Sequence, residues 1–130
     1  MHLTTTDSCY FHDDLSVYAS YGGAAIAQEE GLHIAEALGQ KNKSIILQNH
    51  GILTCGGSVG EAAAYYIALE RACHAQLLAE AAAANGVPKI LVEPQEAEKT
   101  KQMSTPGFMY MQFFPEYELA LKESRGDFLE

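Results

Sequence analysis

The chain has 130 residues and a mass of 14.1 kDa, which is the usual size of one folding unit and argues against two independent cores. Hydrophobic residues make up 48% of the sequence and charged residues 19%, a balance that excludes an intrinsically disordered chain. The 8 Lys and Arg residues against 17 Asp and Glu residues give a net charge of -9, which would repel phosphate backbones and anionic membranes, so nucleic acid is not an expected partner.

Residues 1 to 57 are predicted to hold short strands and one helix. β-Branched and aromatic runs bounded by Asp, Asn and Gly favour the strands. The helix has Glu29 and Glu30 at its positive end and stops at Gly39. Its core-facing residues are expected to be Leu32, Ala35 and Leu38, with His33 on the polar side. The expected elements are strands at Ser8–His12, Leu15–Tyr18, Ser44–Leu47 and Ile52–Cys55, a turn at Tyr21–Gly23 and a helix over Gln28–Leu38.

A long helix is predicted between Ser58 and Gly86. Ser58 and Glu61 form a capping-box pattern at its start, and Asn85-Gly86 followed by Pro88 ends it. Apolar residues recur at spacings of three and four, which indicates one buried face. That face is expected to contain Val59, Ala62, Ala63, Tyr66, Leu69, Cys73 and Leu77, and the polar side Glu61, Glu70, His74 and Glu80.

The remaining residues continue the alternation of helices and strands. We expect a strand at Lys89–Val92, a polar helix over Pro94–Met103, a strand with alternating aromatics at Phe108–Phe114 and a final helix over Pro115–Ser124. The sequence contains no repeat, linker or low-complexity tract. This interleaving predicts a layered domain of mixed α and β structure.

Two features indicate a cytoplasmic protein. No apolar run approaches ~20 residues, and the first residues lack a signal-peptide pattern, so we expect neither a membrane-spanning nor a secreted chain. Cys9, Cys55 and Cys73 are odd in number and lie in no metal-binding spacing. Each is expected to be a small buried hydrophobic residue in a reducing environment.

His50 is the candidate site residue. It stands between Asn49 and Gly51 at the expected bend between two strands, where rigid backbone on both sides would fix its rotamer. Metal-binding histidines need such a fixed ring, so this position suits a metal ligand. A histidine at a turn can equally be a hydrogen-bonded structural residue, and the residue pattern alone leaves both interpretations open.

Two long runs carry a family resemblance: SIILQNHGILTCGG over Ser44–Gly57 and EAAAYYIALERACHAQLLAEAA over Glu61–Ala82. Shorter segments carry the same resemblance: TTDSCYF near the start, YGG at Tyr21–Gly23, GLHIAEALG at Gly31–Gly39, and GFMYMQFFPEYE and GDFLE near the end. Together they resemble the class II aldolase and adducin-head family over nearly the entire chain. In that family the NHG histidine is one of three that hold a catalytic divalent metal, usually zinc. The resemblance therefore implies that His50 is a metal ligand and that zinc is the cofactor.

The resemblance also implies that part of the family site is missing from this sequence. The family domain is close to twice as long, and its first half supplies an HxH pair of ligands and a proton-handling glutamate. No HxH occurs here, because the histidines at positions 2, 12, 33, 50 and 74 are isolated from one another. Zinc catalysis needs three protein ligands, so His50 alone cannot hold the metal. We expect residues 1–130 to form a single partial domain, a layered α/β/α class II aldolase-like C-terminal half with a truncated, mainly antiparallel sheet.

A truncated sheet would expose the edge of a strand, and an unpaired edge invites another chain. We therefore expect a homo-oligomer, or association with a complementary chain that supplies the first half. The family also implies a small-molecule substrate and ring-like tetramers, with the C-terminal segment near a neighbouring subunit. The aromatic residues of that segment are expected to be core, subunit contacts or a pocket lining, and they are Phe108, Tyr110, Phe113, Phe114 and Tyr117.

Three local patterns could replace the missing ligands or bind an anion. His12 with Asp13 and Asp14 is a dense cluster of ligand-type residues, but such a turn is usually solvated. Glu70 and His74 lie at i and i+4 on one helix, where surface pairs are common. Gly56-Gly57-Ser58 precedes a helix N-terminus and could offer N–H groups to an anion, or be a capped turn.

Three functions remain open from the sequence. The first is a metal-dependent carbon–carbon lyase acting on small hydroxy-carbonyl compounds. The second is a non-catalytic binding or scaffold module of the adducin-head type. The third is a metal-free enzyme, such as an isomerase, decarboxylase or cyclase, in which His50 is a general acid or base.

Overall fold

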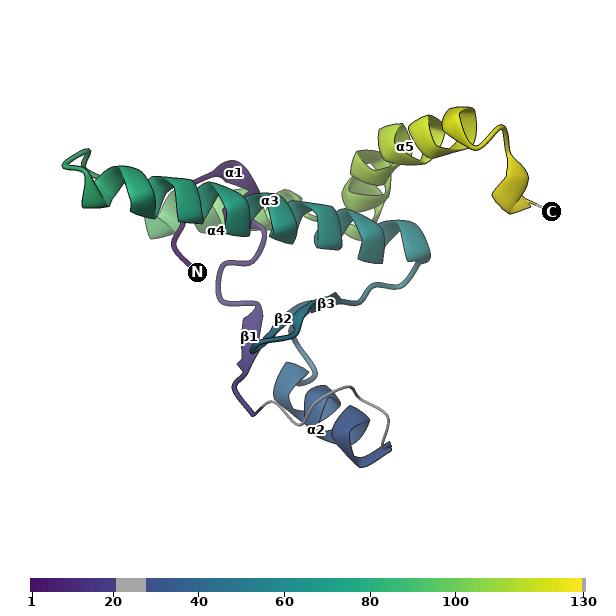
Figure 1. The fold of residues 1–130 in the computed structure, drawn as a ribbon, viewed down its shortest axis with the longest axis horizontal. Coiled ribbons are helices and arrows are strands. Elements are labelled where there is room, and N and C mark those ends of the chain that lie inside the picture. The colour runs from purple at the N-terminus through teal and green to yellow at the C-terminus, as the bar shows by residue number, and fades with distance from the viewer. Residues whose placement is uncertain (21–27, 130) are drawn as a thin grey trace.

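The computed structural model describes residues 1–20 and 28–129, so the turn predicted at Tyr21–Gly23 lies outside the described residues. Helices and strands alternate along the first part of the chain, and helices alone follow (Figure 1). The elements are α1 (Thr6–Cys9), β1 (Leu15–Tyr18), α2 (Gln28–Leu38), β2 (Ser44–Leu47), β3 (Gly51–Thr54), α3 (Val59–Ala84), α4 (Pro94–Met103), α5 (Pro106–Glu123) and the 3-10 turn η1 (Asp127–Leu129).

The described elements form three layers. Helices α1, α3 and α4 lie on one side of the sheet, and α2 lies on the other (Figure 1). The sheet order is β1-β2-β3, with β1 parallel to β2 and β2 antiparallel to β3. The predicted α/β class and layering are confirmed, but the sheet is mixed rather than mainly antiparallel. The parallel pair arises because α2 forms the crossover that brings the chain back beside β1 in the same direction.

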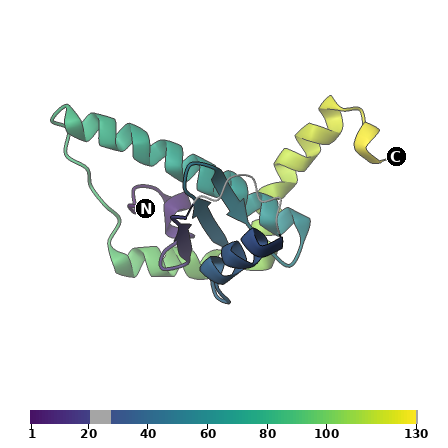
Figure 2. The ribbon, with the colours of Figure 1, turned by 60° about the horizontal axis from the view of Figure 1, so that its bottom comes forward.

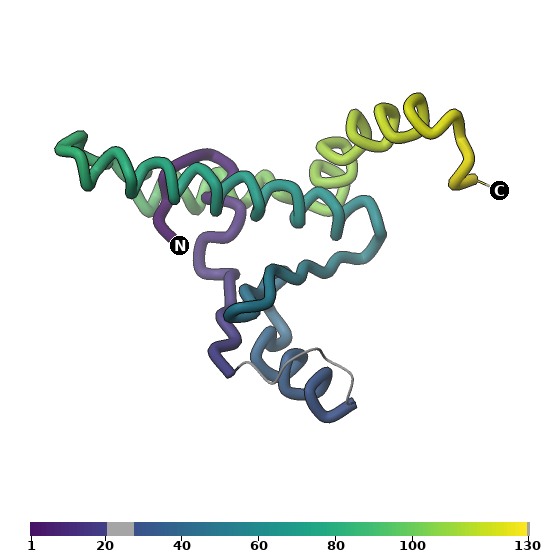
Figure 3. Tube along the Cα trace, in the orientation of Figure 1, coloured from purple at the N-terminus to yellow at the C-terminus, as the bar shows by residue number. Residues whose placement is uncertain are grey.

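The core lies where α3 crosses the other helices. Buried apolar side chains from α3, from α5 and from Phe11, which follows α1, meet there, and Leu69 is fully buried in the same cluster as Met109 of α5. Figure 2 shows α4 running alongside α3, with α1 and the N-terminal segment between them. Figure 3 shows the second half of α5 and η1 projecting away from this body, so η1 lies far from the N-terminus.

Several predicted elements are confirmed. Helices α2 and α4 have the predicted bounds, α3 differs by one or two residues at its ends, and β1 and β2 are as expected. The predicted strand Ile52–Cys55 is β3, which begins one residue earlier. No helix in the described part of the chain is both long and apolar enough to cross a bilayer.

Three predicted strands are wrong, and each has a local cause. Ser8–His12 is replaced by α1, because Thr5 and Ser8 cap each other: Ser8 N–H donates to Thr5 Oγ1 at 3.2 Å and Thr5 N–H donates to Ser8 Oγ at 3.1 Å. Phe108–Phe114 lies inside α5, which also contains most of the predicted Pro115–Ser124 helix. Thr105 caps α5 and Pro106 occupies its first turn. Lys89–Val92 is irregular, and its Val92 N–H donates a hydrogen bond to the Leu3 carbonyl at 2.8 Å.

The predicted buried faces of the two helices were largely wrong. In α2, Leu32 is 63% exposed and no residue is fully buried, because among the described elements its main contacts are with strands β1 and β2. In α3, Leu69 is buried as predicted, but Val59, Tyr66 and Leu77 are exposed. The buried stripe instead contains Gly60, Glu61, Ala64, Tyr65, Ala68, Leu69 and Ala72. Because α3 is apolar on almost every side, periodicity could not choose between faces.

Candidate functional site at the hairpin tip

His50 lies in the exposed turn between β2 and β3. Leu47 pairs with Gly51, and His50 N–H donates to the Leu47 carbonyl at 3.0 Å, which closes the turn. Asn49 adopts a positive φ of 58°, a conformation that asparagine tolerates better than most residues. The turn is also tied to the neighbouring strand, because Gln48 N–H donates to the Tyr18 carbonyl at 3.0 Å. The backbone therefore presents His50 from a hairpin fixed on two sides.

A polar group that the sequence reasoning missed lies at the same end of the sheet. Tyr18 ends β1, and its hydroxyl donates to Glu30 Oε2 of α2 at 3.3 Å. His33 Nδ1 lies 3.8 Å from the same carboxylate oxygen. Desolvation raises the pKa of the Tyr18 phenol, and the hydrogen bond to Glu30 raises it further. The parallel pairing of β1 with β2 places Tyr18 beside the Gln48–His50 turn, and no local pattern in the sequence indicates this long-range pairing.

The acidic turn before β1 is a structural clamp in this fold. Asp14 lies between two lysines, with Lys41 Nζ 3.1 Å from Oδ1 and Lys101 Nζ 3.0 Å from Oδ2. The same lysines donate to backbone carbonyls, Lys41 to Asp13 at 2.9 Å and Lys101 to His12 at 2.7 Å. The carboxylate thus joins the start of β1 to α4 and to the segment before β2. Because its charge is already neutralised, the interpretation as a metal site is not supported.

The glycine-rich junction before α3 is occupied by the chain itself. Ser58 Oγ accepts from Glu61 N–H at 3.1 Å, and Glu61 Oε2 accepts from Gly57 N–H at 2.6 Å. Glu61 is 2% exposed, so its buried carboxylate fills the place that an external anion would take. The capped-turn alternative therefore holds. Glu70 and His74 are both exposed on α3, as expected for a surface pair.

The aromatic residues near the C-terminus divide into two groups. Phe108 and Phe113 pack against the core, and Phe108 makes an edge contact with Tyr10 at 6.1 Å between ring centroids. Tyr110 and Phe114 are 52% and 45% exposed. Core packing therefore explains only part of this group.

A divalent metal at His50 can be tested against the residues around it. Among residues 1–20 and 28–129, no group of three or more His, Cys, Asp or Glu side chains is arranged to hold a metal ion. A catalytic zinc needs about three protein ligands and one open position. The described residues therefore do not complete a zinc site, and His50 could supply one ligand at most.

Comparisons with known proteins agree on one family. The sequence profile of the class II aldolase and adducin N-terminal domain matches residues 1–77. Over 78 residues the chain is 41% identical to a 4-hydroxy-3-prenylphenylpyruvate oxygenase/4-hydroxy-3-prenylbenzoate synthase from Streptomyces roseochromogenus subsp. oscitans, a match that covers 60% of this chain and 28% of that enzyme. It is 36% identical over 90 residues to alpha-adducin from Rattus norvegicus, covering 68% of this chain and 12% of that protein.

A solved structure gives the same result for the fold. The L-fuculose 1-phosphate aldolase from Glaciozyma antarctica PI12 superimposes with a TM-score of 0.71 and 34% sequence identity, over 94% of this chain and 45% of the aldolase chain. The fold of this chain thus also occurs in a solved aldolase. The chain spans less than half the length of each of these three proteins.

Proposed function

The chain belongs to the class II aldolase and adducin N-terminal domain family, and from this premise we propose that it is part of an enzyme that cleaves a carbon–carbon bond in a small hydroxy-carbonyl compound. The observation that supports the proposal most directly is the rigid, exposed presentation of His50 at the hairpin tip. This residue lies within the matched residues 1–77. Residues 1–130 are proposed to act as a single domain, corresponding to part of the family domain.

The proposed chemistry needs a group that moves a proton. Aldol cleavage removes a proton from a hydroxyl group as the adjacent carbon–carbon bond breaks, and the electron pair moves toward a carbonyl oxygen. A second proton transfer then quenches the enolate. An imidazole can act as a general acid or base, and we assign this proton transfer to the exposed His50.

Members of this family generally use a divalent metal, and His50 is our proposed ligand for zinc. The described residues do not complete that site, so we derive no step through the metal. A complete site would require ligands from a second copy or from a complementary chain. The open edge of β1 supports such an association, because β1 pairs with β2 alone among the described residues and its Val17 is 61% exposed.

Two specific observations favour alternative functions. The likeness to alpha-adducin, together with the incomplete metal site in the described residues, favours a non-catalytic binding module. The 41% identity to an enzyme named as an oxygenase and benzoate synthase favours a repurposed enzyme that acts on an aromatic acid. The proposed location is the cytoplasm, because all three cysteines are free thiols.

The first test asks whether the purified chain cleaves L-fuculose 1-phosphate in the presence of zinc. The aldehyde released by cleavage is the quantity measured. We expect His50→Ala to lower the rate about 100-fold or more, the usual loss for a general acid or base. The matched control is His74→Ala, which removes an exposed histidine of α3 and should leave the rate unchanged. A binding module would show no cleavage, and His50→Ala would change neither its assembly nor its stability.

A second measurement tests the association. Light scattering is expected to show an oligomer, and Val17→Lys at the β1 edge is expected to reduce its mass because a charge would enter the contact. A monomer at all working concentrations would contradict this part of the proposal.

A further inference from the structure

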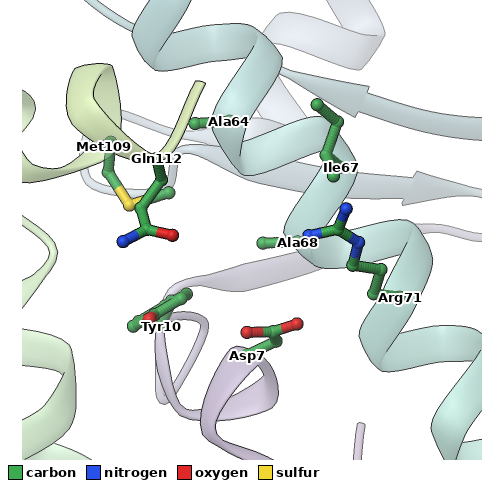
Figure 4. Close-up of a pocket in the computed structure, with 8 residues that line it drawn as sticks. All are labelled: Asp7, Tyr10, Ala64, Ile67, Ala68, Arg71, Met109 and Gln112. Carbon is green, nitrogen blue, oxygen red and sulfur yellow. The ribbon is translucent and has the colours of Figure 1, made fainter. Parts of the chain in front are cut away.

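A cleft unrelated to the hairpin tip lies where α1, α3 and α5 meet (Figure 4). Its apolar floor contains Ala64 and Ala68 of α3 and Met109 of α5. Both alanines are buried and lie one helical turn apart, so they cover little of the space between the helices. The hollow that remains has a volume of about 30 Å³, which is room for about two water molecules.

Polar side chains from all three helices surround this hollow. Asp7 and Tyr10 come from α1 and the residue that caps it, Arg71 from α3 and Gln112 from α5. In Figure 4 the side chains of Arg71 and Gln112 lie on opposite sides of the cleft, and those of Asp7 and Tyr10 lie below them. The cleft thus combines a cation, an anion and neutral hydrogen-bonding groups above an apolar floor.

Most of these polar side chains make no hydrogen bond or ion pair through their side-chain atoms within residues 1–20 and 28–129. The Asp7 carboxylate, the Tyr10 hydroxyl and the Gln112 amide make no side-chain hydrogen bond or ion pair with the described residues. Arg71 Nη2 donates to Glu116 Oε1 at 2.8 Å, which leaves other N–H groups of the guanidinium for a ligand. Burial, and after it the negative charge of Asp7, raises the pKa of Tyr10, so its hydroxyl remains a donor at neutral pH.

The pairing of charges identifies the class of ligand. A simple anion would suit Arg71 but would be repelled by Asp7, and a simple cation would meet the reverse problem. A molecule with both charges on neighbouring atoms satisfies both walls at once. We propose that this cleft binds the head group of a small α-amino acid, with the carboxylate on Arg71 and Gln112 and the ammonium on Asp7.

The side chain of the amino acid points outward in this arrangement. Arg71 and Gln112 are both exposed at the mouth of the cleft, so the hollow needs to admit only the charged head group. Because the ligand would bridge α1, α3 and α5, binding would add contacts between α1 and the first half of α5, which already packs on α3. The site shares no residue with the hairpin tip, so its existence does not depend on the proposed carbon–carbon lyase activity.

The experiment is a titration of the ¹⁵N-labelled chain with glycine and with alanine, in which NMR measures the chemical shifts of the backbone amides. We expect saturable shifts at Asp7, Ala68 and Gln112, and an affinity for acetate or methylammonium alone that is lower by about tenfold or more, since each lacks one charged contact. Glycolate distinguishes a hydroxy acid from an amino acid, and it is expected to bind more weakly than glycine because it leaves Asp7 without a cation.

Variants separate binding from general stability. Asp7→Asn and Arg71→Gln should each weaken glycine binding by about tenfold or more. Glu116→Gln is the matched control, because it breaks the same Arg71 ion pair without changing the cleft lining, and it should leave binding intact or make it tighter. Shifts that do not saturate, that are equal for glycine and acetate, or that persist in both cleft variants would overturn the proposal.

Discussion

The two halves of α3 have similar compositions but opposite environments. Within residues 59–72 lies the buried stripe that includes Tyr65 and Leu69, and this half packs against α1, α5 and β3. Within residues 73–84, Leu77 and Leu78 are 69% and 60% exposed. This half makes polar long-range contacts, from His2 to Gln76 and from His2 and Lys89 to Glu80. An alanine-rich helix therefore does not determine its own buried face, because the elements packed around it decide which residues leave water.

The largest effect should come from truncating equivalent leucines in the two halves. Leu69 is fully buried, so Leu69→Ala should lower the free energy of unfolding by about 2–5 kcal/mol through lost burial and the cavity left behind. Leu78→Ala should change it by less than about 0.5 kcal/mol, because the side chain is already exposed. Urea unfolding followed by far-UV circular dichroism measures both values.

Equal losses in these two variants would contradict the comparison. A large loss for Leu78→Ala would show that the second half is covered in solution, for example by another copy of the chain. Repeating the measurement at several protein concentrations separates these cases, since a contact between copies makes the stability concentration-dependent.

A glycine at the start of α3 tests how closely its buried half is packed. A Cβ at Gly60 would lie 2.8 Å from Cδ2 of Tyr110 and 3.0 Å from Cδ1 of Phe113. Overpacking of this kind costs about 1–3 kcal/mol, which should outweigh the gain of up to about 1 kcal/mol in helix propensity. We expect Gly60→Ala to lower the melting temperature.

The matched substitution is Gly31→Ala in α2. Apart from its chain neighbours and its own helix backbone, no heavy atom of residues 1–20 and 28–129 lies within 4 Å of a Cβ built there, so the gain in helix propensity should appear alone, at about 0.5–1 kcal/mol. Differential scanning calorimetry measures both variants. If Gly60→Ala also stabilised the chain, the contact between α3 and α5 would be looser than the structure shows.

Some features of this fold could be predicted from the sequence alone. The helices over Gln28–Leu38 and Pro94–Met103 were predicted with their observed bounds, because local caps and glycine or proline breaks mark helix ends. The prediction of a strand at Phe108–Phe114 was wrong. Alternating aromatic residues are typical of a strand, but Thr105 and Pro106 mark the start of a helix at this point. Local chemistry therefore predicted element ends better than element faces.

The candidate site shows the same division. The exposed turn that presents His50 followed from Gln48–Gly51, a local signal. The neutralisation of Asp14 by Lys41 and Lys101 joins segments far apart in the chain, so no local pattern could predict it. The Tyr18 and Glu30 contact depends in the same way on a helix folding back onto a strand.

The smallest effect concerns the polar contacts that hold the second half of α3. The hydrogen bond from Lys89 Nζ lowers the pKa of Glu80 below its ordinary value of 4.5, and His2 adds a smaller effect in the same direction. A lowered carboxylate pKa contributes stability that is present above the unfolded value and is lost as the pH falls through the folded value. Glu80→Gln should therefore have its effect near neutral pH and lose it progressively below about pH 4.5. Because the Glu80 side chain is 41% exposed, molar salt should also reduce the effect of Glu80→Gln.

Amide hydrogen exchange at residues 76–84 measures this effect. Compared with a Glu70→Gln control on the same helix, Glu80→Gln should cause faster opening of the second half of α3 alone. Unchanged exchange at neutral pH would show that the polar contacts do not hold this half of α3 in place.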